Sequence, residues 1–186
     1  MLNNKMVSVL KDALVKKKII SIFSDPSMPD LCAVGFALAI SSKHIIISQI
    51  SVNGMYDGYS ARMIDSIFRI DYDGAYEKKI KFLYSLQKQK HLNIINKTIN
   101  KTSNLYKELL LEALKNKMVV AINTVNNDET VFGWVNDIKS NIITIDRINN
   151  DGASDGVSIL LLENIEKIYC DSEDEHTLGI LNSHKK

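Results

Sequence analysis

The sequence predicts an α+β protein, mainly β with helices, built from two tandem five-stranded bent β-barrels that are each preceded by an α-helix. Two observations lead to this prediction. First, the stretches NGMYDGYS (53–60) and DGASDGVS (151–158) carry the same Gly-x-x-Asp-Gly-x-Ser spacing 98 residues apart. Second, each half of the chain has one helical pattern followed by short Ile- and Val-rich segments that turn residues separate.

The two halves of the chain align with each other over most of their length. When residues 35–83 are set against residues 133–181 without a gap, 15 of the 49 positions are identical. The identical pairs include Gly35/Gly133, Ile47/Ile145, Gly54/Gly152, Gly58/Gly156 and Asp73/Asp171. Such a repeat indicates one structural unit used twice. We predict a first unit over 1–90 that ends in a basic helix, a linker over 91–102 and a second unit over 103–186.

Each unit is expected to begin with a helix and to continue as strands. The spacing of Leu10, Ala13 and Leu14 predicts the first helix, and the same residue types recur 100 positions later within 103–116. Strands are expected over 18–23, 34–40, 44–50, 59–64 and 66–71, and over 118–123, 131–138, 142–148, 157–162 and 164–170. Five strands of this length enclose a core most economically as a strongly bent barrel.

The repeated glycines predict where the strands reverse. Gly54 and Gly58, like Gly152 and Gly156, supply backbone that accepts positive φ where one strand turns back into the next. The stretches ISSKHIII (40–47) and IKSNIIT (138–144) place polar residues inside apolar runs, which predicts a further hairpin or sharp bend in each unit. An Asp in such a turn usually caps its own backbone.

A helix followed by five short strands, with Gly35 and Gly133 each preceding alternating apolar residues and a turn, resembles the Sm/LSm-like (Hfq-like) family of small β-barrels. The resemblance covers both units. It implies Sm-like barrels that bind RNA and assemble by pairing exposed edge strands. Ser41 and Ile45 stand where the family's first motif has Asp and Asn, and the second unit departs at the same positions. The typical uridine-binding residues are therefore not matched.

The composition shows no sign of export or membrane insertion. Lys and Arg number 23 against 22 Asp and Glu, so the overall charge demands no polyanionic partner. No run reaches the roughly 18 apolar residues of a membrane helix, and the N-terminus lacks an apolar core of signal-peptide length. The only cysteines, Cys32 and Cys170, form no metal-binding pattern. We expect a cytoplasmic protein with reduced thiols and no membrane partner.

No residue pattern indicates catalysis or a cofactor. The four histidines, His44, His91, His176 and His184, share no metal-ligand spacing. The repeated serines have no repeated histidine that could activate them, and the chain has no glycine-rich phosphate-binding motif. We therefore expect a protein that is not an enzyme, with no catalytic residue, no metal site and no cofactor.

The clearest difference between the two units is a basic stretch. Residues 78–101 contain seven lysines and no acidic residue, whereas the equivalent end of the second unit is rich in Asp and Glu. The candidate nucleic-acid contacts are Lys78, Lys79, Lys81, Lys88 and Lys90. Lysines without neighbouring arginines suit phosphate contact rather than base reading. The alternative is a solvated helix face and linker that balances the acidic barrels.

The position of the only tryptophan leaves its role open. Trp134 follows the repeated Gly133 and corresponds to Phe36, which is compatible with core or barrel-rim packing and with a base-stacking platform. Two functions remain. The first is a non-enzymatic tandem Sm-like protein that binds RNA through a basic surface. The second is a scaffold that assembles with itself or another protein through its edge strands, without nucleic acid.

Overall fold

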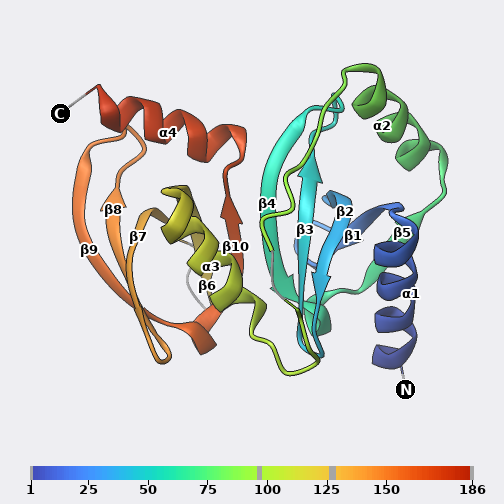
Figure 1. Ribbon diagram of the computed structural model, residues 1–186, viewed down its shortest axis with the longest axis horizontal. Helices are drawn as coiled ribbons and strands as arrows, with labels where there is room; N and C mark the ends of the chain where they lie inside the picture. Colours follow the sequence, from blue (N-terminus) through green and yellow to red (C-terminus); the bar gives the residue numbers. More distant parts are fainter. Residues whose placement is uncertain (1, 96–97, 126–128, 185–186) are drawn as a thin grey trace. The chain divides into compact units, whose positions relative to one another are not determined.

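The computed structural model describes residues 2–95, 98–125 and 129–184 (Figure 1). The chain divides into two compact units, Met1–Leu105 (unit 1) and Tyr106–Lys186 (unit 2). Within the described residues both units have the same order of elements: one helix, five strands and a second helix. The fold class is therefore α+β, as the sequence predicts, and the duplication extends to the structure.

Unit 1 is an antiparallel sheet with a helix before it and a helix after it. Its elements are α1 (Leu2–Lys16), β1 (Ile19–Phe23), β2 (Ala33–Ile40), β3 (His44–Ile50), β4 (Tyr56–Met63), β5 (Arg69–Tyr72) and α2 (Ala75–Leu86). A single 3-10 turn, Ile64–Ser66, lies between β4 and β5. The strand order is β5-β1-β2-β3-β4, and neighbouring strands are antiparallel.

Unit 2 repeats this plan. Its elements are α3 (Leu105–Asn116), β6 (Val119–Thr124), β7 (Val131–Lys139), β8 (Ile142–Ile148), β9 (Ser154–Leu161), β10 (Ile165–Cys170) and α4 (Glu173–Ser183). A 3-10 turn, Leu162–Asn164, precedes β10. The strand order β10-β6-β7-β8-β9 is that of unit 1, element for element, and neighbouring strands are again antiparallel.

The sheet is open, whereas the sequence predicts barrels. Strands β4 and β5 lie at opposite ends of the order in unit 1, as do β9 and β10 in unit 2, and neither pair is joined among the described residues. A short connection follows β4 in unit 1. Its 3-10 turn leads into a strand of only four residues, Arg69–Tyr72, which adds to β1 on the far side of the sheet. The prediction of bent barrels is corrected to an open sheet in each unit.

The first helix of each unit packs on the sheet through the apolar residues whose helical spacing predicts it. In unit 1, Leu10 and Ala13 of α1 are buried in a cluster with residues from the three strands β1, β2 and β3 and from the 3-10 turn and the residue after it. The other buried members are Ile20, Ile22, Ala37, Ile45, Ile47, Ile64 and Ile67. In unit 2 the equivalent residues Leu110 and Ala113 of α3 are likewise buried. Burial of this apolar stripe is what holds a short helix in place.

A second cluster lies beneath the last helix of each unit. Ile80 of α2 packs with Ile19, Val34 and Ile50 in unit 1. In unit 2 the cluster is formed by Val119, Ile148 and Leu178, with Phe132 and Trp134 packed beside it. The helix α4 is an element that the sequence analysis does not predict. Its start is marked by a capping box, in which Ser172 precedes the helix and Glu175 accepts the backbone N–H of Ser172 at 2.9 Å.

The two glycines of the repeated motif have different tasks. Gly54 and Gly152, with φ of 77° and 76°, lie in the turns that join β3 to β4 and β8 to β9. Gly58 and Gly156, with φ of 67° and 80°, lie inside β4 and β9, where the pairing register shifts by one residue. The predicted positive φ is confirmed at all four positions. The second glycine of each pair makes a β-bulge rather than a strand reversal.

The chain after α2 stays with unit 1. Ile94 and Ile95 are buried, and the backbone N–H of Ser42 in the β2–β3 turn donates to the carbonyl of Lys101 at 2.9 Å. Residues 96–97 of the predicted linker lie outside the described residues. The segment between α2 and α3 is therefore more than a solvated tether, since unit 1 runs to Leu105.

Candidate interaction surfaces

The five lysines selected from the sequence are all exposed, on or just after α2. Lys78, Lys79 and Lys81 belong to the helix, which ends at Leu86. Lys88 has a left-handed backbone, with φ of 52°, directly after the helix, and Lys90 lies two residues further on. Lys78 and Lys81 are three residues apart and share a face of the helix, whereas Lys79 points to a neighbouring side. Lys88 and Lys90 extend the basic surface past the C-terminus of the helix.

One acidic side chain lies close to this basic surface. Asp73 accepts a hydrogen bond from Nζ of Lys18 at 2.7 Å, and this bond is the main reason that the pKa of its carboxyl is lowered. The charges of Lys78 and Lys81 lower it further. The start of α2 is therefore less positive than the lysine count of the stretch suggests.

Strand β9 presents the most apolar exposed edge of unit 2. It lies at the end of the strand order, pairs with β8, and runs over eight residues. Val157 and Ile159 are 62% and 72% exposed, and Leu161 is also exposed. Strand β5 of unit 1 is a contrasting edge, because it is four residues long and carries Arg69 and Asp71. Short, charged edges resist pairing with other chains, whereas long apolar ones invite it.

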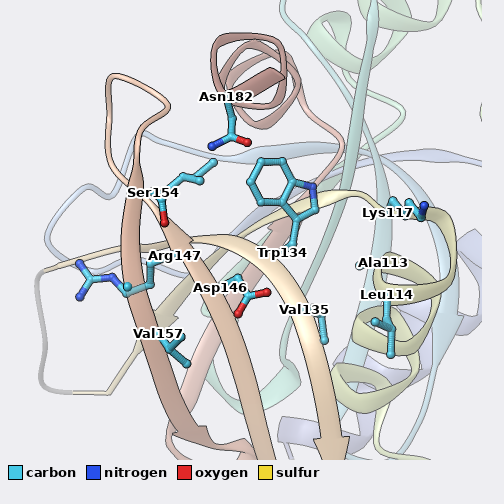
Figure 2. Close-up of a pocket in the computed structure, with 12 residues that line it drawn as sticks. Ala113, Leu114, Lys117, Trp134, Val135, Asp146, Arg147, Ser154, Val157 and Asn182 are labelled. Atoms are coloured by element: carbon cyan, nitrogen blue, oxygen red, sulfur yellow. The ribbon is translucent and has the colours of Figure 1, made fainter. Parts of the chain in front are cut away.

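A groove of about 640 Å³ in unit 2 runs from α3 and α4 to β9 (Figure 2). Its lining residues are Ala113, Leu114, Lys117, Trp134, Val135, Asp146, Arg147, Ile148, Ser154, Gly156, Val157 and Asn182. Figure 2 shows the indole of Trp134 in the middle of this group, below Asn182 of α4. Trp134 therefore packs against the second cluster with one part of its surface and lines the groove with another.

The polar side chains that line the groove are largely engaged within unit 2. Arg147 forms ion pairs with Glu129 at 3.0 Å and with Asp155 at 2.9 Å. Asp146 accepts both its hydrogen bonds from Nδ2 of Asn136, at 3.0 and 2.8 Å. Nδ2 of Asn182 donates to the carbonyl of Gly152 at 2.8 Å. What the groove offers to a ligand is therefore mainly apolar surface.

The equivalent place in unit 1 is filled by the chain itself. The groove residues Trp134, Arg147, Ser154, Val157 and Asn182 correspond, 98 positions earlier, to Phe36, Gln49, Tyr56, Tyr59 and Tyr84. The imidazole of His91 packs against the three tyrosines: it is stacked on Tyr84 at 5.7 Å between centroids, tilted against Tyr56 at 4.6 Å and edge-on to Tyr59 at 5.8 Å. Sequence reasoning missed this cluster because His91 matches no repeat position and no catalytic or metal spacing.

Hydrogen bonds fix the segment that carries His91. Nε2 of His91 lies 2.6 Å from the carbonyl oxygen of Gln49, and Nδ1 lies 3.0 Å from the hydroxyl of Tyr84. The hydroxyl of Tyr59 donates to the carbonyl of Leu92 at 2.8 Å. The side-chain carbonyl of Gln89 accepts the backbone N–H of Tyr56 at 3.1 Å. The segment Gln89–Leu92 is thus held by both main-chain and side-chain contacts, and burial lowers the pKa of the His91 imidazole.

Several other titratable residues considered from the sequence are buried in the core or lie in turns. Burial lowers the pKa of His44, which starts β3, and raises the pKa of the Cys170 thiol well above its usual range. Asp73 and Asp171 both have left-handed φ, 59° and 60°, just before the last helix of their units. Within the described part of the chain no group of three or more His, Cys, Asp or Glu side chains could hold a metal ion.

Two further findings bear on the class of protein. None of the helices in the described residues is both long and apolar enough to cross a membrane. Comparison of the chain with protein-family models, with curated proteins and with solved structures found no match in any of the three. Proposals about function therefore depend on the surfaces described above.

Proposed function

We propose that the protein is a non-enzymatic interaction module of two Sm-like units, which associates with a second copy of itself through the exposed edge of β9. The observation that carries this proposal is the combination, in one eight-residue edge strand, of an available backbone edge and the exposed side chains Val157, Ile159 and Leu161. The strand contains no Lys and no Pro, the residues with which natural edge strands commonly avoid pairing.

The Sm-like part of the proposal is supported by the order of elements. Both units have a helix followed by five antiparallel strands, and Gly35 and Gly133 both lie in the second strand. At both positions a Cβ atom would overlap the carbonyl of the facing strand, at Ser48 and Asp146 respectively. These glycines are therefore needed for close strand approach.

The non-enzymatic part is supported by the positions of the repeated acidic residues. Asp57 and Asp155 precede the bulge glycines, and Asp73 and Asp171 occupy left-handed positions before helices. The left-handed backbone of Asp73 and Asp171 and the ion pair of Asp155 with Arg147 are structural roles. A cytoplasmic location is part of the proposal and is supported by Cys32 and Cys170, which are both free.

Light scattering tests the association. We expect the wild-type chain to reach twice its mass of 21.0 kDa with rising concentration, and Ile159→Lys to stay at the single-chain mass. Leu31→Lys is the matched control, since Leu31 is also an exposed apolar residue but lies in a loop of unit 1. A single-chain mass for the wild type at every concentration would contradict self-association through β9.

A second function, RNA binding, is favoured by one specific observation. Lys78, Lys79, Lys81, Lys88 and Lys90 are all exposed, and none of them forms an ion pair among the described residues. Such a surface can attract phosphates without reading bases. It ranks second because Asp73 lies beside its first turn and because the sequence that it occupies contains no arginine.

A further inference from the structure

The groove of unit 2 is the uncovered counterpart of a surface that unit 1 covers with its own chain. In unit 1 the segment Gln89–Leu92 is hydrogen-bonded to Tyr56 and Tyr59 of β4. Tyr59 is 1% exposed, and Ala61 of the same strand is also buried. In unit 2 the corresponding residues of β9 are the exposed Val157 and Ile159. The backbone of the two sites is alike, because the turn and bulge glycines have matching φ and the registers shift at the same place.

We propose that this groove binds an extended peptide of a partner protein, which inserts an imidazole or aromatic ring beside Trp134 and lays apolar side chains along Val157 and Ile159. The inference rests on the proposed function as an interaction module, and it names the chemistry of the partner. Both proposals use exposed side chains of β9, but only self-association also needs the backbone edge of this strand.

The segment that fills the equivalent place in unit 1 indicates which chemical groups would fill the groove of unit 2. In unit 1 the ring of His91 contacts three aromatic rings and the carbonyl of Gln49, and Leu92 follows it in a segment that is neither helix nor strand. In unit 2 the indole of Trp134 and the side chain of Val157 offer an apolar surface for such a ring. Ring–ring contacts of this kind stabilise a complex beyond the area that they bury.

A nucleic-acid occupant is less well matched to the same groove. The guanidinium of Arg147 is paired with Glu129 and Asp155, and the carboxylate of Asp146 lies in the lining. Acidic side chains beside the one arginine oppose the approach of phosphates. An uncharged ring on a peptide meets no such opposition.

The test uses Trp134 as its own reporter, because it is the only tryptophan of the chain. The probes are three peptides: QKQKHLNII, which is the sequence of residues 87–95, and the same peptide with Phe or Ala in place of His. We expect the His and Phe peptides to change the Trp134 fluorescence of the full chain saturably. The Ala peptide should bind about tenfold more weakly, since it has no ring.

Two variants make the test specific to β9. Val157→Tyr restores the hydroxyl that Tyr59 supplies in unit 1, so the His peptide should bind about fivefold to tenfold more tightly, the effect of one added hydrogen bond. Val157→Asp should weaken binding by a similar factor. Val52→Asp is the matched control, because Val52 is also 62% exposed but lies in the β3–β4 turn of unit 1.

Several results would overturn the inference. These are no saturable change up to about 1 mM peptide, equal binding of the Ala peptide, or no effect of Val157→Tyr. Quenching of Trp134 by a single-stranded oligouridine of about ten nucleotides, without any response to the peptides, would assign the groove to nucleic acid instead. The mass of the wild-type chain is measured without any peptide, so peptide binding by a chain that stays at its single-chain mass would contradict self-association alone.

Discussion

The hydroxyl of Tyr84 and Nδ1 of His91 lie 3.0 Å apart. This contact holds the segment that follows α2 against α2 itself. The carbonyl of Gln49, 2.6 Å from Nε2, can only accept a hydrogen bond, so Nε2 carries the ring proton. In the neutral ring Nδ1 then accepts from the Tyr84 hydroxyl. The cluster is therefore built for the uncharged imidazole.

We predict that acidification weakens this cluster. Burial lowers the pKa of His91 below its usual value of about 6.5, so the unfolded chain takes up a proton before the folded chain does. The stabilising contribution is complete above about pH 6.5 and is lost as the pH falls from there to the lowered pKa, by at most about 1.4 kcal/mol per pH unit.

An NMR titration of the histidine ring protons checks this directly. The midpoint of His91 should lie below the usual histidine value of about 6.5, and His91→Phe should make the free energy of unfolding less dependent on pH around and below about 6.5. Because burial also lowers the pKa of His44, some pH dependence should remain in this variant. A His91 midpoint at or above about 6.5 would contradict the prediction.

The two glycines of one repeated motif should differ in their tolerance of alanine. In unit 2, Gly152→Ala combines a left-handed φ with overlap of the new Cβ on Leu181 of α4, whereas Gly156→Ala has the same φ penalty but open space. Urea denaturation should show a loss of about 1–2 kcal/mol for Gly156→Ala and a larger loss for Gly152→Ala. Equal losses would mean that the approach of α4 to the β8–β9 turn does not matter.

A buried carboxylate in unit 1 makes Ser21 important for stability. The hydroxyl of Ser21 donates to Oε1 of Glu77 at 2.5 Å, and Oε2 accepts the backbone N–H of Gly74 at 3.1 Å. Ser21→Ala leaves one carboxylate oxygen without this donor, which should lower the free energy of unfolding by about 1–3 kcal/mol. The measurement is urea denaturation beside the exposed control Ser85→Ala, which should change little.

If RNA binds the lysines of α2, the loss of binding should depend on which lysines are replaced and not only on how many. If RNA binds there, the triple variant Lys78→Glu, Lys79→Glu, Lys81→Glu should abolish binding of a labelled oligonucleotide, and the affinity of the wild type should fall steeply with added salt. The charge-matched control is Lys5→Glu, Lys11→Glu, Lys16→Glu on the exposed side of α1. Equal loss in both triple variants would indicate a general charge effect and would remove the case for a site on α2.

Some of the fold could be predicted because its signals are local. The helical spacing of Leu10 and Ala13 appears again in the second half of the chain, and both copies are buried as expected. The helix α4 has a local signal as well, the Ser172–Glu175 capping box, although its apolar face is weak beside the acidic first turn. No local signal in the sequence tells whether a sheet closes into a barrel. Closure would require β5 to pair with β4, or β10 with β9, and those strands pair with β1 and β6 instead.

The candidate sites divide in the same way. The five lysines could be named in advance, because exposed charge is visible in composition. The groove around Trp134 and the ring cluster around His91 could not, because their members are separated by tens of residues and come from different elements. Only the comparison of the two folded units shows that Gln89–Leu92 contacts β4 in unit 1, whereas the corresponding residues of β9 in unit 2 are exposed.

What the sequence by itself determined is the duplication, the class of fold and the conformation of the repeated glycines, because identical spacing and φ preference are properties of the chain alone. Tertiary structure alone decided that each sheet stays open, that Gly58 and Gly156 form bulges, and that Gln89–Leu92 covers unit 1 while β9 remains exposed. The physical reason is that packing joins residues far apart in the chain, and two copies of one pattern can meet different neighbours.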